Sequence, residues 1–265
     1  MDNLKIALCQ HDIVWEDARA TLARLEAPVR RFCAKHHPDL LVFPEAFSVG
    51  FTMNPDVAEA PDGPSASWLR ETARSCGAAV VASVPTRDGS HRYNRCWFIT
   101  PEGEEWHYDK HHLFTPSGES LAYEPGMRRC TVPYKGWNIE LNVCYDLRFP
   151  VWSRNVDCGY DLLLNIANWP AIRIEAADML LHARAVENAC YAAFCNRVGE
   201  DSFCAYDGKS MIVNFFGEDM GRRHRVGGIR FLSADLSLSK LQHYRERFPV
   251  TADADAFEMK LPNPS

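Results

Sequence analysis

The sequence predicts an α/β protein in which helices cover sheets that contain both parallel and antiparallel strands. Apolar, strand-like segments alternate with helical ones in the first third of the chain and again over residues 141–198. Pairs of strands typical of hairpins fill the middle and the end. The strand segments are continuous apolar runs, so we expect both faces of each sheet to be covered. We expect residues 1–265 to form a single domain with a polar tail from about residue 251.

The first half of the chain supplies strands separated by two helices. A helical pattern over about 16–37 separates "LKIALCQ" from "DLLVFPE", and another over about 65–76 precedes "AAVVASVP". The segments "RYNRCWFIT" and "EEWHYDK" are joined by the turn "PEG" and predict a hairpin.

The second half repeats this organisation and ends in a helix. "WNIELNVCYD" and "DLLLNIAN" predict strands, and a helix is expected over about 175–188. Three further strand segments follow: "CYAAFCNRV", "MIVNFFG" and "GGIRFLSADL". A last helix is expected over about 237–248, with Ser237 as its N-cap.

Composition argues against several classes of protein. Apolar residues make up 46% of the chain, charged residues 24%, and the net charge is -6. A nucleic-acid partner would require a basic surface, so none is expected. No apolar run reaches the roughly 18 residues of a membrane span. The start "MDNLKIALCQ" lacks the basic and apolar regions of a signal peptide, so we expect a cytoplasmic protein.

The ten cysteines do not form a metal or disulfide pattern. No pair has the CxxC spacing, and a chain of this size without a signal peptide is not expected to depend on disulfides. Adjacent histidines occur at 36–37 and 111–112, but neighbours on a strand point to opposite faces and do not chelate readily. We therefore expect no metal site, and most cysteines to be small buried side chains.

Three reactive side chains lie at or close to the ends of predicted strands. They are Glu45 in "LLVFPEAF", Lys110 in "YDKHHLF" and Cys144 in "LNVCYDLRFP". In α/β sheets, ligands bind beyond the carboxyl ends of the strands. Taken singly, each has an ordinary explanation as a surface glutamate, a solvated lysine or a core cysteine.

The segment around Cys144 favours a nucleophile. A strand, a sharp turn and a helix beginning near Pro150 would present the thiol beside free backbone N–H groups. A thiol needs a base or a positive neighbour. Only His111 and His112 lie near these strand ends, so a buried carboxylate beside a lysine is the alternative base.

These three motifs together resemble the Glu-Lys-Cys triad of the nitrilase superfamily, the carbon–nitrogen hydrolases. The resemblance extends from "LKIALCQ" to "YRERFPV". It is greatest to the omega-amidase branch in four segments: "SVGFTMNP", "NIANWP", "ARAVENACYAAFCNRVG" and "YRERFPVTADAD". It implies a four-layer α-β-β-α sandwich with two central mixed sheets, and a homodimer formed through helices.

The resemblance also implies a role for each residue. Cys144 would be the nucleophile and Glu45 the general base, while Lys110 and the backbone N–H of Tyr145 would bind the oxyanion. Glu119 in "TPSGES" matches an additional acidic residue expected beside Lys110. The implied reaction (class EC 3.5.1) releases ammonia from the terminal amide of 2-oxoglutaramate or 2-oxosuccinamate through a thioester, without a cofactor.

Contacts with the substrate are a separate expectation. Phe47, Tyr145 and Trp169 follow or lie near strand ends and could wall the pocket, although plain core packing explains them equally well. A substrate carboxylate requires a cation or several donors. Arg173 is the candidate for this contact, whereas Arg148 is expected to anchor the loop after the nucleophile.

Three alternatives remain at this point. Another carbon–nitrogen hydrolase, such as an N-carbamoyl amino acid amidase or an aliphatic amidase, would share the same triad. A catalytically silent interaction protein would keep the fold, but it would not need Glu45, Lys110 and Cys144 together at strand ends. A metal or redox protein is disfavoured because CxxC pairs are absent from the sequence.

Overall fold

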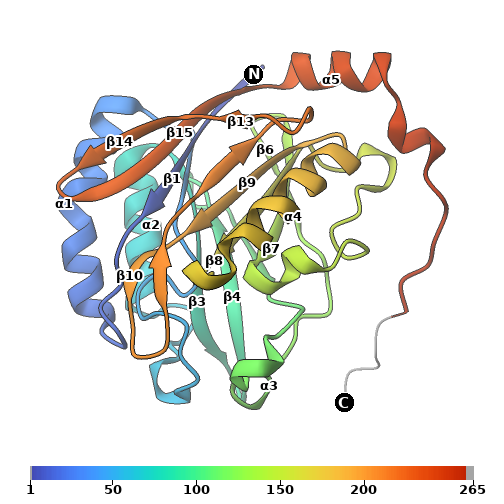
Figure 1. Cartoon of the computed structure of the whole chain (residues 1–265). Coiled ribbons are helices and arrows are strands. Elements are labelled where there is room, and N and C mark those ends of the chain that lie inside the picture. Colours follow the sequence, from blue (N-terminus) through green and yellow to red (C-terminus); the bar gives the residue numbers. More distant parts are fainter. Residues whose placement is uncertain (1, 261–265) are drawn as a thin grey trace.

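A computed structural model, which describes residues 2–260, shows two large mixed sheets packed face to face (Figure 1). In spatial order, the larger sheet contains seven strands: β14 (Arg222–Val226), β15 (Ile229–Ser237), β1 (Asn3–Gln10), β2 (Leu40–Val42), β3 (Ala79–Asp88), β4 (His91–Ile99) and β5 (Glu105–Asp109). The smaller sheet contains six: β13 (Asp219–Met220), β12 (Met211–Val213), β9 (Tyr191–Asn196), β8 (Leu162–Ala167), β7 (Trp137–Val143) and β6 (Thr131–Tyr134). A separate hairpin pairs β10 (Val198–Glu200) with β11 (Ala205–Asp207).

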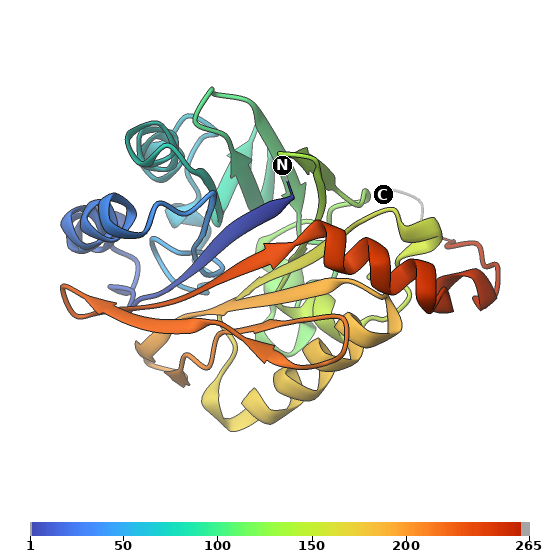
Figure 2. The same ribbon diagram turned by 90° about the horizontal axis from the view of Figure 1, so that it is seen from above.

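Helices form the outer layers. The α-helices are α1 (Ala18–His36), α2 (Pro64–Cys76), α3 (Glu119–Ala122), α4 (Ile174–Glu187) and α5 (Leu238–Arg247). Short 3-10 turns are η1 (Pro55–Val57), η2 (Thr115–Ser117), η3 (Cys144–Arg148), η4 (Val156–Cys158), η5 (Ala171–Arg173) and η6 (Val250–Asp253). The view from above shows α1 and α2 on the outer face of the larger sheet and α4 on that of the smaller sheet (Figure 2). The predicted four-layer sandwich is therefore confirmed. No helix in residues 2–260 is long and apolar enough to cross a membrane.

Three apolar layers hold these elements together. Leu8 of β1 and Leu141 of β7 belong to the core between the sheets, whereas Cys9 of β1 packs in the layer beneath α1 and α2. Leu163 of β8 lies in the third layer, with Leu181 of α4. Successive residues of a strand point to opposite faces, so a strand covered on both sides must be apolar throughout. Full burial of one such side chain contributes about 1.5–3 kcal/mol.

The predicted helices α1, α2, α4 and α5 begin and end within a few residues of the expected bounds. Ser237 caps α5 as predicted, since its hydroxyl accepts a hydrogen bond from the N–H of Lys240 at 3.3 Å. The expected helix at Pro150 is wrong: the turn is η3, which starts at Cys144 and ends before the proline. Strand β14 was not predicted, because "RRHRV" is an edge strand with no apolar pattern.

The topology brings the candidate residues to one edge. Strands β1, β2 and β3 are parallel, as are β7, β8 and β9. Strand β5 pairs antiparallel with β4, which pairs antiparallel with β3, so β5 runs in the direction of β3. Glu45 follows β2, Lys110 follows β5 and Cys144 follows β7, and these carboxyl ends meet at the same edge of the sandwich.

Candidate active site

A tight turn after β2 presents Glu45. The next residue, Ala46, has a φ of 43°, and its N–H donates to the Ser83 hydroxyl of β3 at 2.7 Å. The side-chain amide of Asn168, which directly follows β8, donates to the Glu45 carbonyl at 2.5 Å. The turn is thus held by both sheets, and the Glu45 side chain is fully buried.

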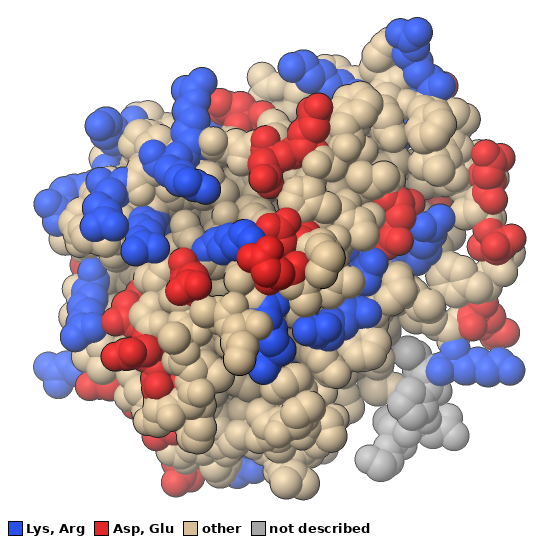
Figure 3. Space-filling model, viewed as in Figure 1, with Lys and Arg blue, Asp and Glu red and all other residues tan. Residues whose placement is uncertain are grey.

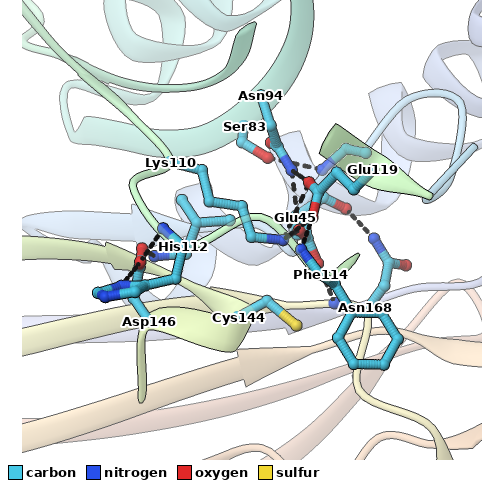
Figure 4. A network of polar contacts seen from close by, with 12 residues as sticks. Glu45, Ser83, Asn94, Lys110, His112, Phe114, Glu119, Cys144, Asp146 and Asn168 are labelled. Carbon is cyan, nitrogen blue, oxygen red and sulfur yellow. Dashed lines mark hydrogen bonds and ion pairs between the residues drawn. The ribbon is translucent and has the colours of Figure 1, made fainter. Parts of the chain in front are cut away.

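Three donors bind the Glu45 carboxylate (Figure 4). Oε1 accepts from Lys110 Nζ at 2.8 Å and from Asn94 Nδ2 at 2.8 Å. Oε2 accepts from the backbone N–H of Asn168 at 2.9 Å. These bonds fix the orientation of the carboxylate, which is what a proton acceptor at a reaction centre requires.

Lys110 is fully buried and lies between two carboxylates. Besides Glu45, its Nζ contacts Glu119 Oε1 at 3.0 Å and Oε2 at 2.9 Å. Its ammonium also lies 4.9 Å from the ring centre of Phe51. Burial acts to lower the pKa of Lys110, but the negative charges of Glu119 and Glu45 outweigh it and raise this pKa above its usual value. Lys110 therefore remains a cation.

Glu119 lies at the start of α3 and is also buried. Its Oε2 accepts the backbone N–H of Phe114 at 2.6 Å, and its Oε1 accepts from Asn94 Nδ2 at 3.2 Å. Burial raises the pKa of Glu119, although the ammonium of Lys110 acts in the opposite direction. Asn94 thus bridges the two carboxylates that hold Lys110.

Glu45, Lys110 and Glu119 form what we name the buried charge cluster. With both carboxylates ionised, it contains two negative charges and one positive charge. The thiol of Cys144 lies next to this excess negative charge. Burial and the carboxylate of Glu45 raise the pKa of Cys144 well above its ordinary value, and Lys110 only partly offsets them. Cys144 is therefore a neutral thiol at rest, with carboxylates nearby to receive its proton.

Cys144 occupies a strained turn directly after β7. Its φ is 46°, a left-handed conformation that costs about 1–2 kcal/mol for a residue with a side chain. Tyr145 follows in η3, and its N–H precedes the first i to i+3 bond of that turn, so the turn itself does not use this donor. Figure 4 shows the Cys144 sulfur directed toward the side where Asn168 lies.

A cleft of about 630 Å³ opens above Cys144. Its walls include seven aromatic side chains and come from both halves of the chain. The lining residues are Trp15, Glu16, Phe51, Thr52, Met53, Asn54, Phe114, Pro116, Ser117, Cys144, Tyr145, Arg148, Asn168, Trp169, Pro170, Arg173, Asp201, Ser202, Phe203, Cys204 and Tyr206. The volume suits a small molecule.

Two guanidinium groups face this cleft. Arg148 lies 4.9 Å from the ring centre of Trp169, and Arg173 lies 5.5 Å from that of Phe114. Within residues 2–260, neither guanidinium forms an ion pair or a side-chain hydrogen bond. Aromatic rings support both cations while leaving their N–H groups available to an anion.

The structure places most of the predicted site residues at the cleft, but Phe47 lies elsewhere. Tyr145, Trp169 and Arg173 line the cleft. Phe47 does not: it is fully buried in the layer beneath α1 and α2, with its ring 5.7 Å from that of Trp68. The turn after Glu45 directs this ring outward to the helices, so the expected pocket wall at Phe47 is corrected to a core position.

Sequence reasoning missed the amides that orient Glu45. Asn168 directly follows the apolar run of β8, the same signal that identified Cys144, so it could have been found. Asn94 lies inside β4, where no local pattern distinguishes it. No group of three or more His, Cys, Asp or Glu side chains in the described part of the chain is arranged to hold a metal ion.

The α-β-β-α sandwich, with the buried charge cluster beside a cysteine at one edge of its sheets, has the features of a hydrolase. The particular family follows from comparison with known proteins. The model of the carbon-nitrogen hydrolase family matches residues 5–246. The chain belongs to this family, which confirms the resemblance found in the sequence.

Individual relatives are similar over nearly their whole length. The omega-amidase YafV of Escherichia coli strain K12 is 40% identical over 260 residues, which cover 98% of this chain and 100% of that protein. The 2-oxoglutaramate amidase of Bacillus subtilis strain 168 is 33% identical over 253 residues, covering 94% and 96%. The crystal structure of XC1258 from Xanthomonas campestris, described as a CN-hydrolase superfamily protein with an arsenic adduct in the active site, is 37% identical. It aligns with a TM-score of 0.92 and covers 98% of this chain and 100% of that one.

Proposed function

We propose that this protein hydrolyses the terminal amide of a small 2-oxo acid, 2-oxoglutaramate or 2-oxosuccinamate, to the dicarboxylic acid and ammonia. The observation that carries the proposal is the position of Cys144, which lines the cleft and lies next to the buried charge cluster. The names of the E. coli and B. subtilis relatives support the choice of substrate.

Acylation begins with proton transfer from Cys144 to Glu45. The thiolate attacks the amide carbon, and the carbonyl oxygen becomes an oxyanion bound by Lys110 Nζ and the N–H of Tyr145. Loss of one such donor typically costs about 3–4 kcal/mol of transition-state stabilisation. Glu45 returns the proton to the amide nitrogen, the carbon–nitrogen bond breaks and ammonia leaves. A thioester then joins the acyl group to Cys144.

Deacylation reuses the same groups. Glu45 removes a proton from a water molecule, whose oxygen attacks the thioester carbon. Lys110 and the Tyr145 N–H bind the second oxyanion. The carbon–sulfur bond breaks, the sulfur regains a proton from Glu45, and the acid leaves. Glu119 keeps Lys110 oriented through both steps, since it contacts Nζ with both oxygens.

The far end of the substrate needs a partner for its carboxylate. Arg173 is our first candidate, and Arg148 is a second that the sequence analysis assigned to loop anchoring. Both line the cleft, and both leave their N–H groups free of ion pairs in the described part of the chain. Trp169 and Tyr145 line the same cleft as these cations and Cys144, where they would exclude water from the thioester.

An ammonia-release assay tests the proposal. The panel contains 2-oxoglutaramate, 2-oxosuccinamate, an N-carbamoyl amino acid and a neutral aliphatic amide. We expect the two 2-oxo acid amides to give the highest kcat/KM and the Cys144→Ala protein to give none. A preference for the N-carbamoyl or aliphatic compound would overturn the substrate assignment and leave the hydrolase class intact.

We also infer that the protein acts in the cytoplasm, where a catalytic thiol stays reduced. A separate inference is that it forms a homodimer. Ile172, Met179 and Val186 repeat every seven residues along η5 and α4, and Ile172 is 88% exposed. Figure 3 shows a broad area with few charged side chains below α4. Met179→Glu should convert a dimer to a monomer in size-exclusion chromatography with light scattering, and a monomeric unaltered protein would contradict the inference.

A further inference from the structure

A second buried carboxylate lies beside the nucleophile, outside the buried charge cluster. Asp146 follows Cys144 by two residues and is fully buried. Its Oδ2 accepts from the Tyr108 hydroxyl at 2.8 Å and from the Val143 N–H at 2.9 Å. Its Oδ1 accepts from the N–H of His112 at 2.9 Å and from Nδ1 of the same residue at 2.8 Å. Figure 4 shows Asp146 and His112 paired beside Lys110.

These partners bracket Lys110. Tyr108 precedes it by two residues on β5, and His112 follows it by two residues. Asp146 belongs to the turn after β7, in the other sheet. One carboxylate therefore joins both sides of Lys110 to the turn that carries Cys144, and it does so across the two sheets.

The partners of Asp146 are themselves fixed. The Tyr108 hydroxyl accepts from Trp152 Nε1 at 3.0 Å and from the His111 N–H at 3.2 Å. The His112 ring stacks on Phe149 with centres 3.6 Å apart and an interplanar angle of 4°. Because each partner is held by a further contact, Asp146 lies in a rigid network rather than on a mobile turn.

The turn at Cys144 needs such support. Its left-handed conformation is unfavourable for cysteine, so the surrounding structure must impose it. The bond from the Val143 N–H to Asp146 closes the turn around Cys144. Tyr145 lies between Val143 and Asp146, inside the closed turn. The direction of its N–H therefore depends on this closure.

We propose that Asp146 is a positioning residue that fixes the Tyr145 N–H and the Lys110 ammonium around the carbon attacked by Cys144. This inference rests on the proposed function, in which those two groups bind the oxyanion. Asp146→Asn keeps the size of the side chain but replaces one acceptor oxygen with an NH₂ group. Each carboxylate oxygen of Asp146 accepts two hydrogen bonds. In either orientation of the amide, its NH₂ group would therefore face two hydrogen-bond donors.

The test compares two reactions of the same thiol. In amide hydrolysis, Asp146→Asn should lower kcat by about 10²- to 10³-fold, with KM changed by less than about threefold. In alkylation by iodoacetamide, the sulfur forms a carbon–sulfur bond as iodide leaves, and no oxyanion develops. The second-order rate of Cys144 alkylation, followed by mass spectrometry, should therefore stay within about threefold of that of the unaltered protein.

Two variants complete the design. His112→Phe preserves the stack on Phe149 and the backbone N–H but removes the Nδ1 donor, so kcat should fall by a smaller factor of about ten. Asp161→Asn changes a buried aspartate at the opposite end of the smaller sheet and should leave kcat unchanged. The His112→Phe comparison stands if Asp146→Asn does not fold.

Three results would overturn the inference. They are a folded Asp146→Asn protein with unchanged kcat, a parallel loss of alkylation and hydrolysis, and an unchanged kcat in His112→Phe. Failure of the proposed function is distinct, because then the unaltered protein would hydrolyse no amide while its Cys144 could still be alkylated.

Discussion

Buried charges lie at both ends of the parallel strands of the smaller sheet, and the two ends differ in charge balance. At the amino end, Asp161 accepts from Arg245 Nη1 at 2.8 Å, and Arg245 also donates to the Ala189 and Tyr160 carbonyls at 2.8 and 2.7 Å. This pair joins one anion with one cation. At the carboxyl end, the buried charge cluster holds two carboxylates against one ammonium.

The difference distinguishes a structural ion pair from a reactive one. The Asp161–Arg245 pair attaches α5 to the smaller sheet and leaves no charge uncompensated. Burial is the largest cause of the raised pKa of Glu119 and of Cys144, and the negative charge of Glu45 also raises both. Buried groups with perturbed pKa values concentrate at functional sites. Variants at the two ends should therefore affect activity and stability differently.

The largest contrast is between two cysteines. Cys144→Ala should lower amide hydrolysis by about 10⁴-fold or more, because no other group can form the thioester. The melting temperature should change little, since the strained residue loses only its sulfur. Cys190→Ala removes a fully buried thiol from the layer beneath α4 and should reduce stability by about 1 kcal/mol with kcat unchanged. An ammonia-release assay measures the activity of each variant, and thermal unfolding measures its stability. Substantial activity in Cys144→Ala would exclude Cys144 as the nucleophile.

The next contrast removes the cation from each of the two clusters of buried charge. Lys110→Met should lower kcat by about 10²- to 10³-fold, because an oxyanion donor is lost. It also leaves two carboxylates facing each other, so its stability should improve as pH falls and they take up a proton. Arg245→Met should cost about 3–5 kcal/mol of stability instead, since it leaves Asp161 buried and unpaired. Equal kcat values for Lys110→Met and the unaltered protein would exclude the oxyanion role.

Local sequence patterns predicted some of these residues and not others. Glu45 and Cys144 follow apolar runs and Lys110 lies close to the end of a strand, but only the resemblance to the nitrilase superfamily joined the three into one site. Phe47 was misplaced because the direction of its side chain depends on the turn at Ala46. No local sequence pattern predicts the positive φ of Ala46. The Asp161–Arg245 pair joins residues 84 apart, so only the fold reveals it.

A smaller effect is expected for the cations of the cleft. Arg173→Gln should raise KM for 2-oxoglutaramate by about 10- to 100-fold, the range for loss of a hydrogen bond between charged groups. It should leave KM for a neutral amide unchanged. Arg148→Gln is the matched variant, since Arg148 also lies on an aromatic ring in the same cleft. If KM rises only in Arg148→Gln, the carboxylate contact moves to that residue.

The smallest effect concerns the charge excess itself. Glu119→Gln leaves one carboxylate and one ammonium, the balance found at the amino end. Because the charge of Glu119 contributes to the raised pKa of Cys144, its removal should lower that pKa. The pH profile of Cys144 alkylation by iodoacetamide should then shift to lower pH. Asp161→Asn should not move the profile, and a shift to higher pH in Glu119→Gln would contradict the role assigned to the excess charge.

The most direct test of the account is to trap the thioester. The enzyme is mixed with a slowly hydrolysed 2-oxo acid amide, quenched in acid during turnover and mapped by peptide mass spectrometry. We predict that the peptide containing Cys144 gains the mass of the acyl group, the substrate less ammonia, and that the other nine cysteines stay unmodified. Steady ammonia release with no adduct on Cys144, or with the adduct on another cysteine, would contradict the account.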